Sequence, residues 1–515
     1  MGKEFLAAIA ADSPLTASAG ARMAELGGNA VDIAVSAGLT ATVSEILMCS
    51  LGGSAFCMIR LPGHPPELID GADAVPTIEA VAPSQSDAWR RFQVPYGDGI
   101  EVIAGHASVA VPGMLAAVEL AWRRHGTLPW SEIVSPALEL AKQGCPVEAT
   151  VANWLQLSGK GLFDQQPASR ESFFSSDGEP LKEGDRFHIP HLDQALEAIV
   201  QNGASAFYKG DLATAFVREM ERNGGFVTRE DLASYRAKVR KPLTLHSCGY
   251  ELTLNPPPAV GGAALGTLIG LIDRSWQHEA TEPEITAMHA RIQRSLLGSR
   301  DSSFTPAPSQ ALEPEQLLSE QTFRQHLKAF SSPNTTHLSV VTRDGGMVAL
   351  TMSNGYGSGV TIPGTGIPCN NSLGEPELNP LGFYKAKPGA RLISNMAPTL
   401  AWNEKGTSLA FGSPGASRIT TSMAQFWTNY ALRGLSLQEA ISAPRLHVEQ
   451  SEQGFRLLCE PGIDTTRCEQ DYQVRRFEMR DMFFGALQVA AIEKSGVGVA
   501  LTDDRRNGAI RIVEK

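Results

Sequence analysis

Thr335 stands where a polar, proline-containing stretch gives way to an alternating, strand-like pattern. A threonine that begins a strand is ordinarily structural, because β-branched residues favour strands. If the peptide bond between Asn334 and Thr335 were cut, Thr335 would carry a free α-amine with an unperturbed pKa of about 8. That amine can take the proton of the threonine's own hydroxyl near neutral pH, so one residue would supply both nucleophile and base. We therefore expect a self-cleaving chain that uses Thr335 for acyl transfer.

The segment GSPGAS at residues 412–417 would supply the hydrogen-bond donors that acyl transfer needs. It joins an expected strand to an expected helix, so the backbone N–H groups of Gly415 and Ala416 would lie at a helix N-terminus and face a developing oxyanion. An ordinary strand-to-helix turn would have the same pattern. His337 invites a general-base role, but the α-amine already fills that need, so we expect His337 to be structural.

Composition narrows the class of protein. The chain has 515 residues, 43% hydrophobic and 19% charged, which favours a folded protein with several domains or one large layered unit. A net charge of -11 argues against nucleic-acid or anionic-membrane partners. No apolar run approaches the roughly 18 residues of a membrane span, and the N-terminus lacks a secretory signal pattern. Seven scattered cysteines without CxxC spacing favour buried thiols in a reducing compartment, so we expect a cytoplasmic protein with no metal or organic cofactor.

The hydrophobic pattern predicts a helix-rich first half and a strand-rich start to the second. Asp344, Gly345 and Gly346 predict a hairpin turn between strands at residues 338–341 and 347–350. Residues 302–334 read as a loose connector with one short helix. Other expected strands are residues 55–60, 391–400 and 408–411. Expected helices are residues 15–26, 30–44 (buried on most sides), 114–124, 130–142, 192–201, 212–222, 262–272 and 417–432.

Ten collinear fragments resemble the gamma-glutamyltranspeptidase family, from about residue 17 to about residue 450. They are LGGNAVD (26–32), SLGGSAF (50–56), VAVPG (109–113), FYKG (207–210), residues 224–232, PPPAVGG (256–262), TTH (335–337), NN (370–371), GSPGASR (412–418) and APRLH (443–447). One such fragment would be weak evidence, but ten in order identify the chain as a member of this family.

The resemblance implies a four-layer alpha-beta-beta-alpha fold of the N-terminal nucleophile hydrolases. It also implies an inactive precursor that cuts itself before Thr335 into a large subunit, residues 1–334, and a small catalytic subunit, residues 335–515. The subunits would stay together as a heterodimer, and a dimer of heterodimers is left open. A small-molecule substrate would form an acyl-enzyme on Thr335, resolved by water or by an amine.

The resemblance also assigns roles to other residues. Gly415 and Ala416 would form the oxyanion hole, although the family has a second glycine where Ala416 stands. Ser353 falls where the family has a threonine that orients the nucleophile. Ser394 and Asn395 occupy the family's Ser-Ser pair, which contacts the substrate carboxylate, and Glu375 would keep one carboxylate of the acidic pair that holds the substrate amine.

One departure affects the substrate. The family clamps the substrate α-carboxylate with an arginine in a motif Asp-x-Arg-Glu-x-Ala-Pro, whereas this chain reads DGADAVP at residues 70–76, with Ala72 in the arginine position. A charge-paired hydrogen bond of that kind contributes about 1.5–3 kcal/mol, so its loss would weaken glutamyl binding roughly ten- to a hundredfold. Arg391 or Arg418 would have to supply a substitute.

The leading hypothesis is an amide hydrolase or acyltransferase whose substrate is not glutathione. A true gamma-glutamyl hydrolase or transpeptidase of glutathione metabolism is an alternative. A third, which the resemblance implies because similar family members occur in such pathways, is a carbon–carbon bond hydrolase in the biosynthesis of alkylproline-type antibiotics; the same acyl-enzyme would serve it. A non-enzymatic binding protein would require a damaged Thr335 or Gly415 segment, and neither is damaged.

Overall fold

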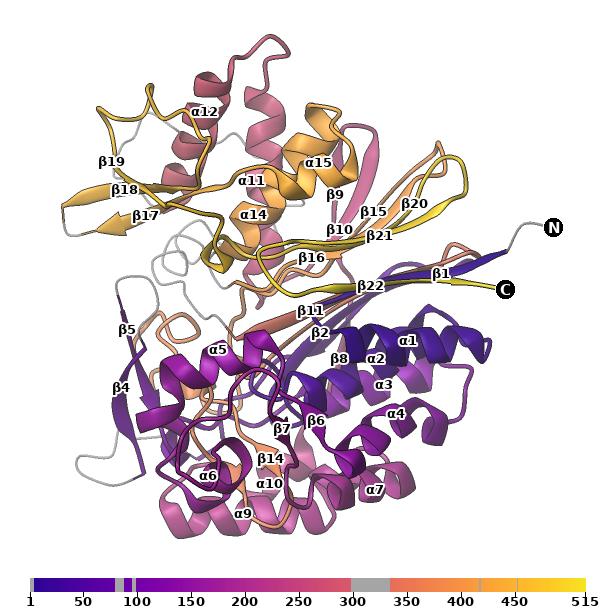
Figure 1. The fold of residues 1–515 in the computed structure, drawn as a ribbon, viewed down its shortest axis with the longest axis vertical. Helices are drawn as coiled ribbons and strands as arrows, with labels where there is room; N and C mark the ends of the chain where they lie inside the picture. The colour runs from indigo at the N-terminus through magenta and orange to yellow at the C-terminus, as the bar shows by residue number, and fades with distance from the viewer. Residues whose placement is uncertain (1–3, 79–87, 95–98, 298–333, 416–417, 452) are drawn as a thin grey trace.

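The computed structural model describes residues 4–78, 88–94, 99–297, 334–415, 418–451 and 453–515. Two β-sheets stack face to face in the middle of the molecule, and helices cover the outer face of each (Figure 1). This arrangement is the four-layer alpha-beta-beta-alpha fold that the resemblance implies. The expected connector at residues 302–334 lies outside the described residues except for Asn334.

The first sheet interleaves strands from both ends of the chain. Its order is β22-β1-β11-β12-β2-β3-β8, and every neighbouring pair with a given register is antiparallel. The strands are β1 (Phe5–Ala11), β2 (Ser54–Arg60), β3 (Glu67–Gly71), β8 (Lys238–Arg240), β11 (Thr335–Thr342), β12 (Met347–Ser353) and β22 (Ala509–Glu514). The hairpin expected around residues 344–346 is therefore confirmed as β11–β12. β11 lies in the interior of the sheet, between β1 and β12.

The second sheet has the order β21-β20-β16-β15-β10-β9. Its strands are β9 (Leu243–Ser247), β10 (Tyr250–Leu254), β15 (Thr399–Asn403), β16 (Ser408–Gly412), β20 (Gln488–Ile492) and β21 (Gly498–Thr502). Small side chains fill much of the space between the two sheets, among them Ala8, Ala10, Ala349, Ala410 and Ala490. Because alanine occupies little volume, the two sheets can pack closely.

Helices on the first sheet come from the first half of the chain. α1 (Pro14–Glu25) packs on β1 and β22, α2 (Ala30–Ser44) on β11 and β12, and α3 (Met114–His125) on β2 and β3, with α4 (Trp130–Gln143) behind α2. Every residue of α2 is buried, as its apolar pattern predicts. Asn29 and Asp32 close a capping box at its start, which satisfies amides that the first turn leaves open.

Helices on the second sheet are α11 (Gly261–Ser275), α12 (Glu282–Leu296), α14 (Arg418–Trp427) and α15 (Leu437–Ser442). The remaining helices lie farther out: α5 (Ala149–Ser158), α6 (Pro167–Phe173), α7 (Leu192–Asn202), α8 (Ser205–Tyr208), α9 (Asp211–Asn223) and α10 (Arg229–Ser234). So do the small sheets β4 (Arg90–Val94) with β5 (Ile100–Ala104), β6 (Cys145–Pro146) with β7 (Arg186–Phe187), β13 (Thr361–Ile362) with β14 (Ile367–Pro368), and β17 (Leu446–Ser451), β18 (Gly454–Cys459) and β19 (Gln473–Arg476).

One sequence prediction needs correction. The expected strand at residues 391–400 is mostly irregular, and only Thr399 and Leu400 belong to β15. Arg391 makes an isolated bridge with Ala74, so its extended backbone does not join a sheet. The expected helix at residues 417–432 is confirmed over its described residues: α14 runs to Trp427 and continues without a break as a π-helical segment, Thr428–Leu432.

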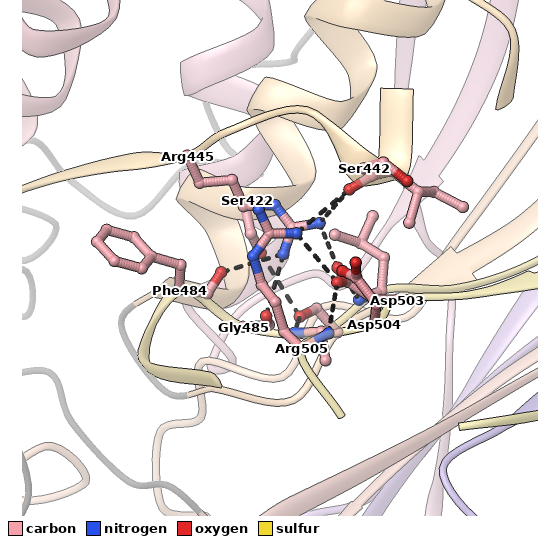
Figure 2. A network of polar contacts seen from close by, with 12 residues as sticks. Ser422, Ser442, Arg445, Phe484, Gly485, Asp503, Asp504 and Arg505 are labelled. Carbon is pink, nitrogen blue, oxygen red and sulfur yellow. Dashed lines mark hydrogen bonds and ion pairs between the residues drawn. The ribbon is translucent and has the colours of Figure 1, made fainter. Parts of the chain in front are cut away.

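A buried ion-pair network holds the end of the second sheet. Figure 2 shows Arg445 and Arg505 pointing toward Asp503, and both arginine side chains are almost wholly buried. Arg445 also donates to the carbonyls of Phe484 and Gly485, at 3.2 and 3.0 Å. Burial alone would raise the pKa of Asp503, but the charges of Arg445 and Arg505 hold it below its usual range. The network thus joins the segments on either side of β20 and β21.

Replacing Asp503 with alanine should leave two buried guanidinium groups without this carboxylate. Breaking a buried pair from one side costs about 3–5 kcal/mol, so we expect Asp503→Ala to lower the free energy of unfolding by that amount. The measurement is urea denaturation followed by tryptophan fluorescence. The control is Asp504→Ala, whose pair with Arg480 is exposed and should matter by about 1 kcal/mol or less. Equal effects of the two variants would contradict the role of the network.

Candidate active site

A row of side chains crosses the first sheet at the edge of the inter-sheet space. Thr335 is opposite Ser353, and Ser353 is opposite Ser54 on the next strand. Because directly opposed residues of antiparallel strands share a face, these three side chains lie on one face. Ala55 is opposite Gly71, so Ala72 continues the row one residue beyond the end of β3. The register of four strands therefore aligns Thr335 with Ala72, the residue expected to stand in the family's arginine position.

The Ser353 hydroxyl connects the side chain of Thr335 to the peptide bond before it. Thr335 Oγ1 lies 3.4 Å from Ser353 Oγ, and Ser353 donates to the carbonyl oxygen of Asn334 at 2.7 Å. The Gly355 amide donates to Ser353 at 3.1 Å and fixes the hydroxyl from the other side. Arg506 donates to the Thr335 carbonyl at 2.7 Å. The threonine and the bond that precedes it are thus held from both sides.

A cavity of about 40 Å³ opens beside this row. Among its lining residues are five of the predicted site residues: Thr335, Ser353, Glu375, Ser394 and Asn395. They come from β11, β12 and irregular segments before β15, so segments distant in sequence meet at one place. The structure brings these predicted residues together.

The predicted oxyanion segment lies next to the cavity but is only partly described. Gly415 follows β16 and is absent from the cavity lining, whereas Ile419, in the first turn of α14, lines it. Gly415 has a φ of +120°, and a Cβ there would lie 2.8 Å from the Cα of Gly485, so a side chain would be strained and crowded. Ala416 lies outside the described residues.

The proposed substitute arginines are engaged elsewhere. Arg391 donates to the backbone carbonyls of Ala72 and Arg236, and Arg418 donates to the Phe483 carbonyl at 2.9 Å. Neither lines the cavity, and no arginine or lysine is among the described residues that do. Among the described lining residues, therefore, no other guanidinium group compensates for the alanine at residue 72.

The acidic and basic side chains among the described lining residues are all carboxyl groups. Asp73, Glu375 and Glu377 all line the cavity and are all buried. Ser372 donates to Asp73 at 2.6 Å, and Tyr356 donates to Glu377 at 2.8 Å. Burial raises the pKa of Asp73 to about 8, and the Ser372 hydroxyl, the Arg391 charge and the Gly113 amide only partly offset it. Sequence reasoning gave Asp73 no role, although it directly follows Ala72.

His337 is held as a neutral structural side chain. Its two ring nitrogens lie 2.8 Å from Thr351 Oγ1 and 2.9 Å from Ser339 Oγ. Burial lowers the pKa of His337 to about 3. Gly412 on the facing sheet has no side chain, and a Cβ there would lie 2.3 Å from the imidazole. Both nitrogens are engaged away from the cavity, which supports the structural role expected from the sequence.

The comparison with known families decides the identity. The family model of gamma-glutamyltranspeptidase matches residues 16–513. The chain belongs to the gamma-glutamyltranspeptidase family. It is therefore an enzyme of the N-terminal nucleophile hydrolase class, a hydrolase or acyltransferase.

Similar family members include two proenzymes. The chain is 31% identical over 454 residues to the glutathione hydrolase proenzyme of Escherichia coli (strain K12), covering 82% of this chain and 77% of that one. It is 30% identical over 463 residues to the acylase ACY 1 proenzyme of Pseudomonas sp. (strain SE83), covering 86% and 82%. Both names support a self-processing precursor that is cut into subunits.

A solved family structure shares the whole fold. Cephalosporin acylase from Bacillus halodurans superposes with a TM-score of 0.77 and 24% identity, over 99% of this chain and 96% of that chain. At this identity the likeness supports the fold alone.

Among the helices that the structure describes, none is both long and apolar enough to cross a membrane.

The other face of β11 contacts two buried acidic residues, Asp12 and Glu45. Thr336 Oγ1 lies 3.1 Å from Asp12 Oδ2 and also contacts Glu45 Oε2. A hydroxyl has one hydrogen, so Thr336 can donate to only one of these two carboxyl groups at a time. A proton on Glu45 completes the chain, because Glu45 can then donate to Thr336 while Thr336 donates to Asp12. Consistent with this, burial and the Asp12 charge raise the pKa of Glu45 to about 8.

Replacing Glu45 with glutamine should flatten the pH dependence of stability. The folded-state pKa of about 8 lies above the ordinary glutamate pKa of 4.5, so this carboxyl favours the folded state fully below about pH 4.5. The contribution is lost as pH rises to about 8, by about 1.4 kcal/mol per pH unit. A glutamine side chain does not titrate in this range, so the free energy of unfolding of Glu45→Gln should fall less between pH 5 and 8. Urea denaturation across this range measures the difference, with exposed Glu25→Gln as the control; parallel curves for wild type and Glu45→Gln would contradict the protonated carboxyl.

Proposed function

We propose that the chain cuts itself before Thr335 and then uses Thr335 as the nucleophile of an amide hydrolase or acyltransferase. The products would be a large subunit, residues 1–334, and a small subunit, residues 335–515. The substrate would be a small-molecule amide whose acyl group is not gamma-glutamyl. The observation that carries the proposal is the Ser353 hydroxyl, which contacts Thr335 Oγ1 and donates to the Asn334 carbonyl.

Self-cleavage follows from that contact. Thr335 Oγ1 attacks the carbonyl carbon of Asn334, and the hydrogen bond from Ser353 stabilises the charge that develops on the carbonyl oxygen. The C–N bond breaks, the nitrogen takes the hydroxyl proton, and the acyl group is left as an ester on Thr335. Water then hydrolyses the ester, which gives residue 334 a carboxylate and leaves Thr335 with a free amine and a free hydroxyl.

The same residue then acts on the substrate. The new α-amine accepts the hydroxyl proton while Oγ1 attacks the substrate carbonyl, and the proton passes to the leaving amine. The backbone N–H groups of Gly415 and Ala416 would stabilise the oxyanion. Ser353 would orient the nucleophile, and Glu375, Ser394 and Asn395 would contact the acyl group. The orienting role of Ser353 and the substrate contacts of the other three residues are supported by their position, since all four line the cavity.

The proposal of a different substrate rests on the charges of the residues that line the cavity. A gamma-glutamyl group carries an α-carboxylate that needs a cation, and no arginine or lysine is among the described lining residues. The second candidate is nevertheless a gamma-glutamyl hydrolase, because a relative at 31% identity is named glutathione hydrolase proenzyme. Prompt release of aniline from a gamma-glutamyl anilide by the wild-type enzyme would favour that candidate.

Processing is tested by denaturing electrophoresis and mass spectrometry of the purified protein. Wild type should give fragments of residues 1–334 and 335–515, and Thr335→Ala should remain one chain because it lacks the attacking oxygen. Ser353→Ala should slow cleavage about a hundredfold, since one oxyanion donor is lost. Ser353→Thr keeps a hydroxyl at the same place and is the matched control. An uncut wild-type chain with full activity would refute the mechanism.

The altered pocket is tested by restoring the family's arginine. Ala72→Arg should raise kcat/KM for a gamma-glutamyl anilide by about tenfold or more, because a guanidinium can pair with the α-carboxylate. Ala72→Met adds comparable bulk without charge and should give no such gain. If Ala72→Arg and Ala72→Met behave alike, the missing cation does not explain the specificity.

A further inference from the structure

Asp73 presents an unused hydrogen-bonding atom at the cavity. Its side chain is nearly inaccessible to solvent, with 3% of the residue exposed, and it lines the cavity beside Ala72. Oδ2 accepts from Ser372 at 2.6 Å, whereas Oδ1 has no hydrogen-bond partner among the described residues. Leaving a buried polar atom unpaired costs free energy unless a ligand or water satisfies it. Asp73 Oδ1 is therefore available for a donor that enters the cavity.

We propose that Asp73 binds a primary ammonium group on the substrate's acyl chain, so that this pocket takes a cation where the family takes a carboxylate. The inference deepens the proposed function and rests on it, since the acyl group must be delivered to Thr335. An ammonium has three donors and no acceptor, which suits a carboxyl oxygen that lacks a donor.

The surrounding charges favour a cation. Glu375 and Glu377 share the cavity with Asp73. Arg391 is the cation that acts on Asp73, but its guanidinium donates to backbone carbonyls and stacks 3.9 Å from the ring centroid of Tyr235. Among the described residues, Tyr208 and Tyr235 also interact with Asp73, and burial raises the pKa of both phenols, so they stay neutral. A carboxylate entering here would meet acidic groups and no free guanidinium from Arg391.

The strand register sets the distance that the substrate's acyl chain must span between Thr335 and Asp73. Thr335 and Ala72 are separated by three strand spacings, roughly 14 Å between backbones. Much of that length is occupied by the attacked carbonyl and by the side chains of Thr335 and Asp73. An acyl chain with its ammonium roughly four to six atoms from the carbonyl carbon would then fit.

The test compares three para-nitroanilides with the same methylene chain: δ-aminovaleryl, hexanoyl and adipoyl. These end in an ammonium, a methyl and a carboxylate. In the self-cleaved wild type, kcat/KM should be about ten- to a hundredfold higher for the amine than for hexanoyl, and lowest for adipoyl. In Asp73→Asn the ratio of amine to hexanoyl should fall toward one. Asp177→Asn, the same change at an exposed turn, should keep the wild-type ratio. Shorter and longer aminoacyl anilides locate the best reach.

The pH dependence of the same ratio gives an independent readout. Because Asp73 has a pKa of about 8 in the empty site, it must lose its proton to pair with an ammonium, so the amine-to-hexanoyl ratio should rise as pH increases through about 8. Titration of the Thr335 amine affects both substrates and cancels in the ratio. In Asp73→Asn this rise should disappear.

Different results overturn different claims. A ratio near one in wild type, a preference for adipoyl, or an unchanged ratio in Asp73→Asn overturns the ammonium site. Mass spectrometry of the small subunit reports the acyl adduct on Thr335 separately. A chain that cuts itself but forms no adduct with any of the three donors also overturns the ammonium site, whereas an uncut chain overturns the proposed function.

Discussion

The pairing of β11 with strands on both sides is the constraint on which the site depends. β11 is bonded to β1 over residues 7–11 and to β12 over seven residue pairs, and β12 is bonded in turn to β2. β1 and β2 belong to the part before Thr335, whereas β11, β12 and β22 belong to the part after it. Strand hydrogen bonds and shared cores would therefore hold the two parts together after the chain is cut, with the first residue of the new end fixed in the sheet.

Alternation along β11 directs neighbouring side chains to opposite faces of the sheet. Thr335 and His337 face the other sheet, one toward the cavity and one against Gly412, while Thr336 faces Asp12 and Glu45 below the sheet. A slip of one residue would turn Thr335 toward these two carboxyl groups and Thr336 toward the cavity. Arg506 opposes such a slip because it donates to the Thr335 carbonyl and pairs with Asp12 at 3.4 Å.

The sequence predicts those helices and turns whose hydrophobic periodicity or turn residues lie within a short stretch of the chain. The buried helix at residues 30–44 and the hairpin around residues 344–346 have clear periodicity and turn chemistry, and both are confirmed. The sequence predicts no strand for β1, because its strand character depends on partners more than 300 residues away, β11 and β22. The cavity residues before β15 were predicted through the family resemblance. Asp73 was missed because its importance comes from burial and an unpaired oxygen, which no residue pattern encodes.

The placement of the site explains how one scaffold can change substrate. Thr335 and Ser353 lie on interior strands whose positions are fixed by neighbours on both sides. Asp73, Glu375 and Ser394 lie on irregular segments beyond strand ends, where a new side chain disturbs no ladder of hydrogen bonds. An alanine in place of an arginine at residue 72 would therefore remove a charge from the pocket without altering the strand register that places Thr335. Because acidic side chains remain buried around that position, such a change would favour a cation in the pocket while the contacts around Thr335 stay the same.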